Sequence, residues 1–198
     1  FVLKKQQQTS CDPVTAFGTA GSYTHNAPLL VTDKFYRGMD LAVSSATGNV
    51  AVCGTVEEDG QPMKLFVVVV NGVTGALLSE TLYTNADIAP EIAALGDFKR
   101  VFMEAVPGSG NAVLSLATDD NRLSLIMVNT ATGALVPSCL KAFGAVPTLN
   151  NYVEPIVDID FRNINSSPVK IANDLLFLGF NHDLTGSGVV RSFNLSGG

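Results

Sequence analysis

The chain has 198 residues, of which 46% are hydrophobic and 15% are charged, and its net charge is −6. This composition excludes a disordered chain, which has few apolar residues and many charges. The acidic balance and the lack of clustered Lys and Arg exclude nucleic acid as an expected partner. No apolar run approaches the roughly 18 residues of a membrane-spanning helix, so we expect no membrane span.

The chain opens on Phe1-Val2-Leu3, a short apolar run that predicts a strand. Phe1 is not an initiator Met, and no signal-peptide pattern follows it, so we expect the sequence to start within a longer or processed polypeptide. Residues 1–35 are interpreted as the end of a preceding repeat and a linker.

Short segments of β character then follow one another, separated by turns rich in Gly, Asn and Asp. One candidate helix of two turns lies at 88–95. The predicted strands fall in two sets of four and one set of two: 39–45, 49–55, 64–71 and 77–83; 100–105, 112–117, 123–129 and 135–140; 175–180 and 188–193.

The sets are related by an internal repeat with a period near 62 residues. Gly48-Asn49-Val50 returns as Gly110-Asn111-Ala112, and the Asn-x-x-Thr-Gly turn at 71–75 returns at 129–133. Ala16-Phe17-Gly18 returns as 142–144, and 194–198 falls where a third Asn-x-x-Thr-Gly turn is due. The spacing changes by a few residues only within a hairpin turn, as expected for a structural repeat.

Four antiparallel strands per repeat indicate an all-β fold, a partial β-propeller of about three four-stranded blades. The expected blades are 36–84, 85–146 and an incomplete 147–198, within one β-repeat domain over 1–198. The strands would number two, four, four and three, so other segments of the same polypeptide or another chain are expected to complete the sheets. A β-sandwich with a similar number of strands is the alternative.

The segment from Asp12 to Gly21 resembles the Phe-Gly stretch that ends blades of the delta-60-type propeller repeat. The Gly-Asn-Val and Asn-x-x-Thr-Gly pieces are similar to motifs of quinoprotein-like propellers. The chain departs from the delta-60-type pattern in two ways: it lacks the Leu before Asp12, and its second copy at 139–144 has lost the Asp and the trailing Gly. The resemblance therefore implies the propeller fold and not one specific family.

Val157 to Phe161 places Asp158 and Asp160 on one face of a predicted strand. Two such carboxylates could bind a metal cation or form an acid–base pair. The competing interpretation is a solvated or channel-lining face. Asp119-Asp120-Asn121 is interpreted as a turn, not a calcium loop, because it lacks the alternating ligands of one. His182-Asp183 is a weaker candidate base, because adjacent side chains in an extended loop point apart.

Three cysteines, Cys11, Cys53 and Cys139, are either small buried hydrophobic residues or include one disulfide, for which Cys11–Cys139 is the pair to test. Their spacing does not suggest a metal site, and no cofactor is expected. Two N-glycosylation sequons begin at Asn165 and Asn194 and favour a secreted protein.

These observations favour a non-catalytic propeller module for binding or structural assembly, extracellular or at the cell surface. Two alternatives stay open. One is a fragment of a propeller enzyme with Asp158 and Asp160 at the channel mouth. The other is a subunit of a polymeric surface filament.

Overall fold

A computed structural model gives the fold of the chain. It describes residues 2–7, 12, 14–25, 34–58, 60–88, 98–118, 123–136, 141–143, 169–172, 175–181 and 188–194. The described strands are all antiparallel, and they form four sheets of two, four, four and three strands. The chain is therefore all-β, as its sequence predicts.

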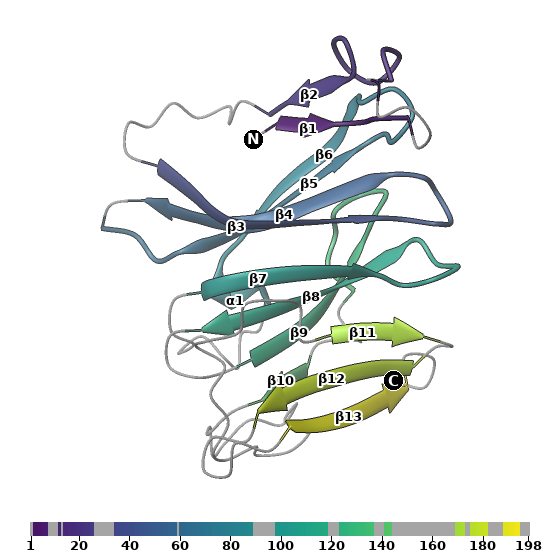
Figure 1. Cartoon of the computed structure of the whole chain (residues 1–198). Helices are drawn as coiled ribbons and strands as arrows, with labels where there is room; N and C mark the ends of the chain where they lie inside the picture. Colours follow the sequence, from purple (N-terminus) through teal and green to yellow (C-terminus); the bar gives the residue numbers. More distant parts are fainter. Residues whose placement is uncertain are drawn as a thin grey trace.

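Each larger sheet is a meander in which consecutive strands are neighbours (Figure 1). The first sheet is β1 (Val2–Lys4) and β2 (Ser22–Thr24). The second is β3 (Lys34–Val43), β4 (Val50–Glu58), β5 (Lys64–Val70) and β6 (Leu77–Tyr83). The third is β7 (Phe98–Ala105), β8 (Asn111–Thr118), β9 (Leu123–Asn129) and β10 (Lys141–Phe143). The fourth is β11 (Val169–Ala172), β12 (Leu175–Asn181) and β13 (Gly188–Asn194).

The sheets are stacked in chain order, and the first strands of the last three lie next to one another (Figure 1). β3 packs beside β7, and β7 packs beside β11. A short helix, α1 (Asn85–Ile88), follows β6. No helix in the described ranges is long and apolar enough to cross a membrane.

The continuous apolar run of β5 is explained by burial on both faces. Leu65, Val67 and Val69 belong to a core cluster shared with β7, β8 and β9, while Phe66, Val68 and Val70 belong to a second cluster under β1 and β2. All six side chains are at most 1% exposed. A strand with one wet face would alternate apolar and polar residues, so the run marks a sheet covered on both sides.

The Asn-x-x-Thr-Gly turns repeat atom for atom. The Oδ1 of Asn71 accepts hydrogen bonds of 2.9 Å from the backbone N–H groups of Val73 and Thr74. The Oδ1 of Asn129 accepts the same pair, at 2.9 and 3.1 Å, from residues 131 and 132. Gly75 and Gly133 close the two turns at φ 70°, a conformation that glycine adopts without steric cost. The internal repeat is thus present in three dimensions.

These two turns also join the second and third sheets to the sheet before each of them. The Tyr83 hydroxyl donates to the Gly133 carbonyl at 2.6 Å, and the Asn49 amide donates to the Thr130 carbonyl at 3.1 Å. At the previous junction the Lys5 ammonium donates to the Gly72 carbonyl at 2.7 Å, and the Gly18 N–H donates to the Thr74 carbonyl at 2.7 Å.

Most predicted strands are confirmed, and two expectations change. The fourth strand described in the third sheet is Lys141–Phe143, after the predicted 135–140; within that segment Leu135 makes a bridge to Val128, and 137–140 lie outside the described residues. Pro137 in the predicted segment has no amide hydrogen to donate to a strand ladder. Of the candidate helix at 88–95, Ile88 is the last residue of α1, and the rest lies outside the described residues.

Candidate functional site

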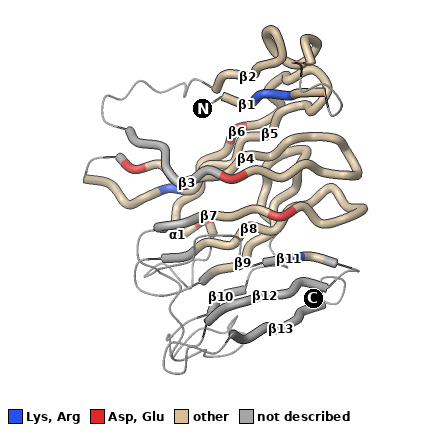
Figure 2. Tube along the Cα trace, viewed as in Figure 1, with Lys and Arg blue, Asp and Glu red and all other residues tan. Residues whose placement is uncertain are grey.

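The first strands of three consecutive sheets carry a line of charged side chains, Asp40 on β3, Glu104 on β7 and Lys170 on β11, here called the first-strand row. Figure 2 shows the charged residues of the described strands, which also lie on β1 and β6. Because these strands are adjacent, the row crosses from sheet to sheet instead of running along one strand.

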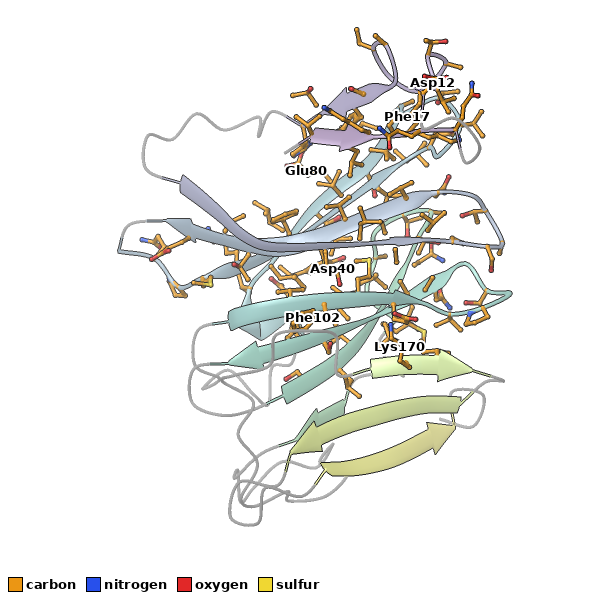
Figure 3. All side chains as sticks on the ribbon, in the orientation of Figure 1. Asp12, Phe17, Asp40, Glu80, Phe102 and Lys170 are labelled. Atoms are coloured by element: carbon orange, nitrogen blue, oxygen red, sulfur yellow. The ribbon has the colours of Figure 1, made fainter. Side chains whose placement is uncertain are left out.

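Asp40 connects two strand edges. Its Oδ1 accepts a 2.8 Å hydrogen bond from the Leu41 N–H, and its Oδ2 accepts a 2.9 Å bond from the Met103 N–H on β7. Asp40 lies at an irregularity of the β3–β4 ladder, where the register shifts between Arg37 and Asp40. The labelled side chain lies between β3 and β7 in Figure 3. The carboxylate thus bonds backbone amides of two sheets, which is an architectural role.

Glu104 and Lys170 form the other contact of the first-strand row. The Lys170 Nζ lies 3.0 Å from the Glu104 Oε2, and the lysine side chain is 72% exposed. Ion pairs this exposed contribute at most about 1 kcal/mol. The pair therefore orients two charges at the junction of β7 and β11 and leaves them accessible to a ligand.

A second cluster lies at the other end of the stack, where β2 meets β6. The Tyr23 hydroxyl lies 3.0 Å from the Nδ1 of His25, and the Nε2 of His25 lies 3.3 Å from the Oε1 of Glu80. The His25 side chain is only 4% exposed. Burial, with a smaller effect of the Glu80 carboxylate, raises the pKa of Tyr23.

The chemistry of this cluster is limited by its position. A histidine between a hydroxyl and a carboxylate is the arrangement of a general base. Here the hydroxyl belongs to a tyrosine two residues away, and its raised pKa disfavours the phenolate. The cluster holds the β1–β2 sheet against β6. Sequence reasoning missed it, because His25 and Glu80 are neither adjacent nor one period apart.

Cys53 is a free, fully buried thiol on β4, opposite Asp40 in the ladder. Burial is the main cause that raises its pKa, and the Asp40 carboxylate raises it further. A thiol held neutral in this way is a poor nucleophile. Cys53 is therefore a small core residue, as the sequence suggests.

Most of the predicted site residues fall in parts of the chain that the structure does not describe. Asp158, Asp160, Asn165, Cys11 and Cys139 lie outside the described residues, as do 119–121 and 182–183. Asn194 is the last residue of β13, so its sequon enters the segment that follows this strand. Within the described ranges, no group of three or more His, Cys, Asp or Glu side chains could hold a metal ion.

No protein-family model matches the chain. No curated protein matches it either.

Proposed function

We propose that this chain is a β-propeller module with a binding or structural role outside the cell, and not a catalytic domain. One observation carries the proposal. Two successive four-stranded meanders repeat the same turn chemistry and stack with their first strands adjacent, and a third sheet continues the series. Blades around a common axis have this relation, with the first strand of each blade innermost.

The sheet β3–β6 favours a propeller over a sandwich. A β-sandwich has two layers, so each of its sheets buries one face and leaves the other to solvent. The sheet β3–β6 instead contributes one face to the cluster with Val67 and the other to the cluster with Val68. Burial on both faces is what a blade between two blades requires.

The first-strand row supports a binding role. In a propeller the innermost strands surround the central channel, where ligands and partners are commonly held. Among the described side chains of these strands, Glu104 and Lys170 are accessible charges, while the Asp40 carboxylate bonds two backbone amides. The proposed partners are other segments of the same polypeptide, or another protein chain, that complete the ring.

Electron microscopy of the protein purified from its source tests the architecture. We expect averaged images of a ring of sheets around a channel. A two-layer sandwich would contradict the proposal.

Lysine cross-linking and mass spectrometry of the same native material test the role. We expect cross-links from Lys4, Lys5 or Lys170 to polypeptide outside these 198 residues. Internal cross-links alone would contradict a module that works by association. Glycans on Asn165 or Asn194 would support the extracellular location.

A further inference from the structure

One face of the β3–β6 sheet is only half covered. Leu41 and Val43 on β3 are 47% and 54% exposed, although they share a face with buried Val52. Leu41 lies directly opposite Val52, and Val43 lies opposite Val50, which packs against the cluster of Phe17, Phe66 and Val68. The apolar face is thus buried over its two middle strands, β4 and β5, and open over its first strand; on β6, Leu82 opposite Phe66 is 38% exposed.

The repeat shows what belongs there. Leu41 and Val43 correspond to Met103 and Ala105 of β7, one period later, because Leu41 pairs with Val52 as Met103 pairs with Leu114. Met103 is 3% exposed, since it packs into the core cluster shared with the β3–β6 sheet, and Ala105 packs against the same cluster. The same position is therefore covered at one junction and uncovered at the other.

The two-stranded sheet accounts for the difference. Its last residues reach β6, because His25 contacts Glu80, and Lys5 reaches the turn after β5 through Gly72. The β1–β2 pair thus lies over the third and fourth strands of the sheet below. Among the described strands, β1 pairs only with β2, so its second edge can accept another strand.

We infer that the surface formed by Leu41, Val43 and the unpaired edge of β1 is a docking site for a β-hairpin of a partner segment. The hairpin pairs with β1, places apolar side chains at alternate positions on Leu41 and Val43, and completes a four-stranded sheet. This inference rests on the proposed propeller architecture and identifies where it is completed.

A second copy of this chain does not fit as the occupant. In the described strands, the hairpins formed by the first two strands of a sheet are β3–β4, β7–β8 and β11–β12, and each is already paired with a third strand, β5, β9 or β13. Burying two aliphatic side chains of this size contributes about 1.5 to 3 kcal/mol each when burial is complete. Because these hairpins are already paired within their own sheets, the docking hairpin comes from polypeptide other than these strands.

A synthetic peptide with the sequence of residues 34–58 and Cys53→Ser is the probe, because β3–β4 covers the equivalent position at the next junction. A lone hairpin is marginally stable in water, so the peptide orders on binding. The readout is the rate of maleimide labelling of Leu41→Cys in the 198-residue chain, with Cys11→Ser and Cys139→Ser as background. Buried Cys53 does not compete.

We expect the peptide to slow labelling of Leu41→Cys about tenfold at ten times its Kd. Leu77→Cys on β6, matched at 49% exposure, keeps its rate, and Met103→Cys is protected with or without peptide. Val43→Cys serves as a second reporter on the same surface.

Three other outcomes would each contradict one part of the inference. Unchanged labelling of Leu41→Cys overturns the docking site. Protection that depends on chain concentration without peptide assigns the surface to a second copy and overturns the hairpin. Rapid labelling of Met103→Cys would instead refute the sheet stacking, and with it the proposed function.

Discussion

At the scale of single residues, Gly75 meets two requirements at the junction between sheets. Its φ of 70° lies in the left-handed region, and a Cβ there would lie 2.6 Å from the Gly18 backbone nitrogen. Gly60 has almost the same φ, 71°, but nothing lies within 4 Å of its Cβ position. Substitutions at the two glycines can therefore be compared: both would suffer backbone strain, but only a side chain at Gly75 would also overlap a neighbouring sheet.

We predict that Gly75→Ala lowers the free energy of unfolding more than Gly60→Ala does. Both substitutions carry the left-handed backbone cost of about 1 to 2 kcal/mol. Gly75→Ala adds overpacking against the Gly18 backbone, typically about 1 to 3 kcal/mol. Urea unfolding of the two variants measures the difference, and equal losses would mean that the turn at 71–75 does not dock on the β1–β2 sheet.

At the scale of an element, the edge of β7 that faces away from β8 depends on a residue of another sheet. We predict that Asp40→Ala lowers the free energy of unfolding by about 1 to 3 kcal/mol, because the Met103 N–H loses its acceptor. Asp40→Asn keeps one side-chain oxygen and should lose less. Denaturant unfolding of both variants tests this, and identical losses would show that the carboxylate does not bridge β3 and β7.

The short helix α1 makes a pH-dependent contribution to the free energy of unfolding. The Asp87 Oδ2 accepts hydrogen bonds from the Thr84 hydroxyl at 2.6 Å and the Thr84 N–H at 2.8 Å, and the Thr84 hydroxyl accepts from the Asp87 N–H at 3.3 Å. This reciprocal capping lowers the pKa of Asp87. Folding therefore favours the ionised carboxylate.

A group with a lowered folded pKa stabilises above its ordinary pKa, and this contribution is lost as the pH falls through the lowered value. We predict that the native chain is slightly more stable than Asp87→Asn at about pH 7 and that the gap closes as the pH falls below the ordinary pKa of an aspartate. Thermal unfolding across this range measures the gap. A gap that persists at low pH would show that the loss comes from the amide substitution and not from the charge.

The sequence predicts the elements unevenly, for physical reasons. β5 is easy to find because an apolar run buried on both faces has no periodic polar positions. β3 begins at Lys34, several residues before the predicted start, because its ladder continues past the irregularity at Arg37 and Asp40. β10 is harder to place from sequence, because the apolar pair Leu135 and Val136 predicts a strand before Lys141, where β10 begins.

At the scale of the whole molecule, the period near 62 residues is visible in the sequence. The contacts that join one sheet to the next can be predicted from the sequence only in part. The contact of Asp40 with Met103 spans 63 residues and could be found by pairing positions one period apart. The contact of His25 with Glu80 follows no period and needs the coordinates. The exposure of Leu41 also cannot be predicted from the sequence. Met103, the corresponding residue one period later, is just as apolar as Leu41, yet Met103 is buried.

The stacking predicts an order of stability across the sheets. β5 is paired on both edges and buried on both faces, whereas β1 and β2 form a two-stranded pair that packs one face on the cluster with Phe66 and Val68 and bonds Gly72, Thr74 and Glu80. We predict that amides of β5 exchange with deuterium slowest and those of β1 and β2 fastest among these strands, because local opening requires few broken contacts there. Hydrogen exchange followed by mass spectrometry measures this.

A variant sharpens the prediction. His25→Ala removes the contact with Glu80, so exchange in β1 and β2 should accelerate while exchange in β5 stays unchanged. Glu57→Ala, on β4 away from this contact, is the matched control. In a stack of blades each sheet depends chiefly on its neighbours, so the effect should stay at one junction. Equal acceleration of amide exchange in all strands would show that the sheets unfold as a single unit. The β1–β2 pair would then not be a sheet that opens independently of the others.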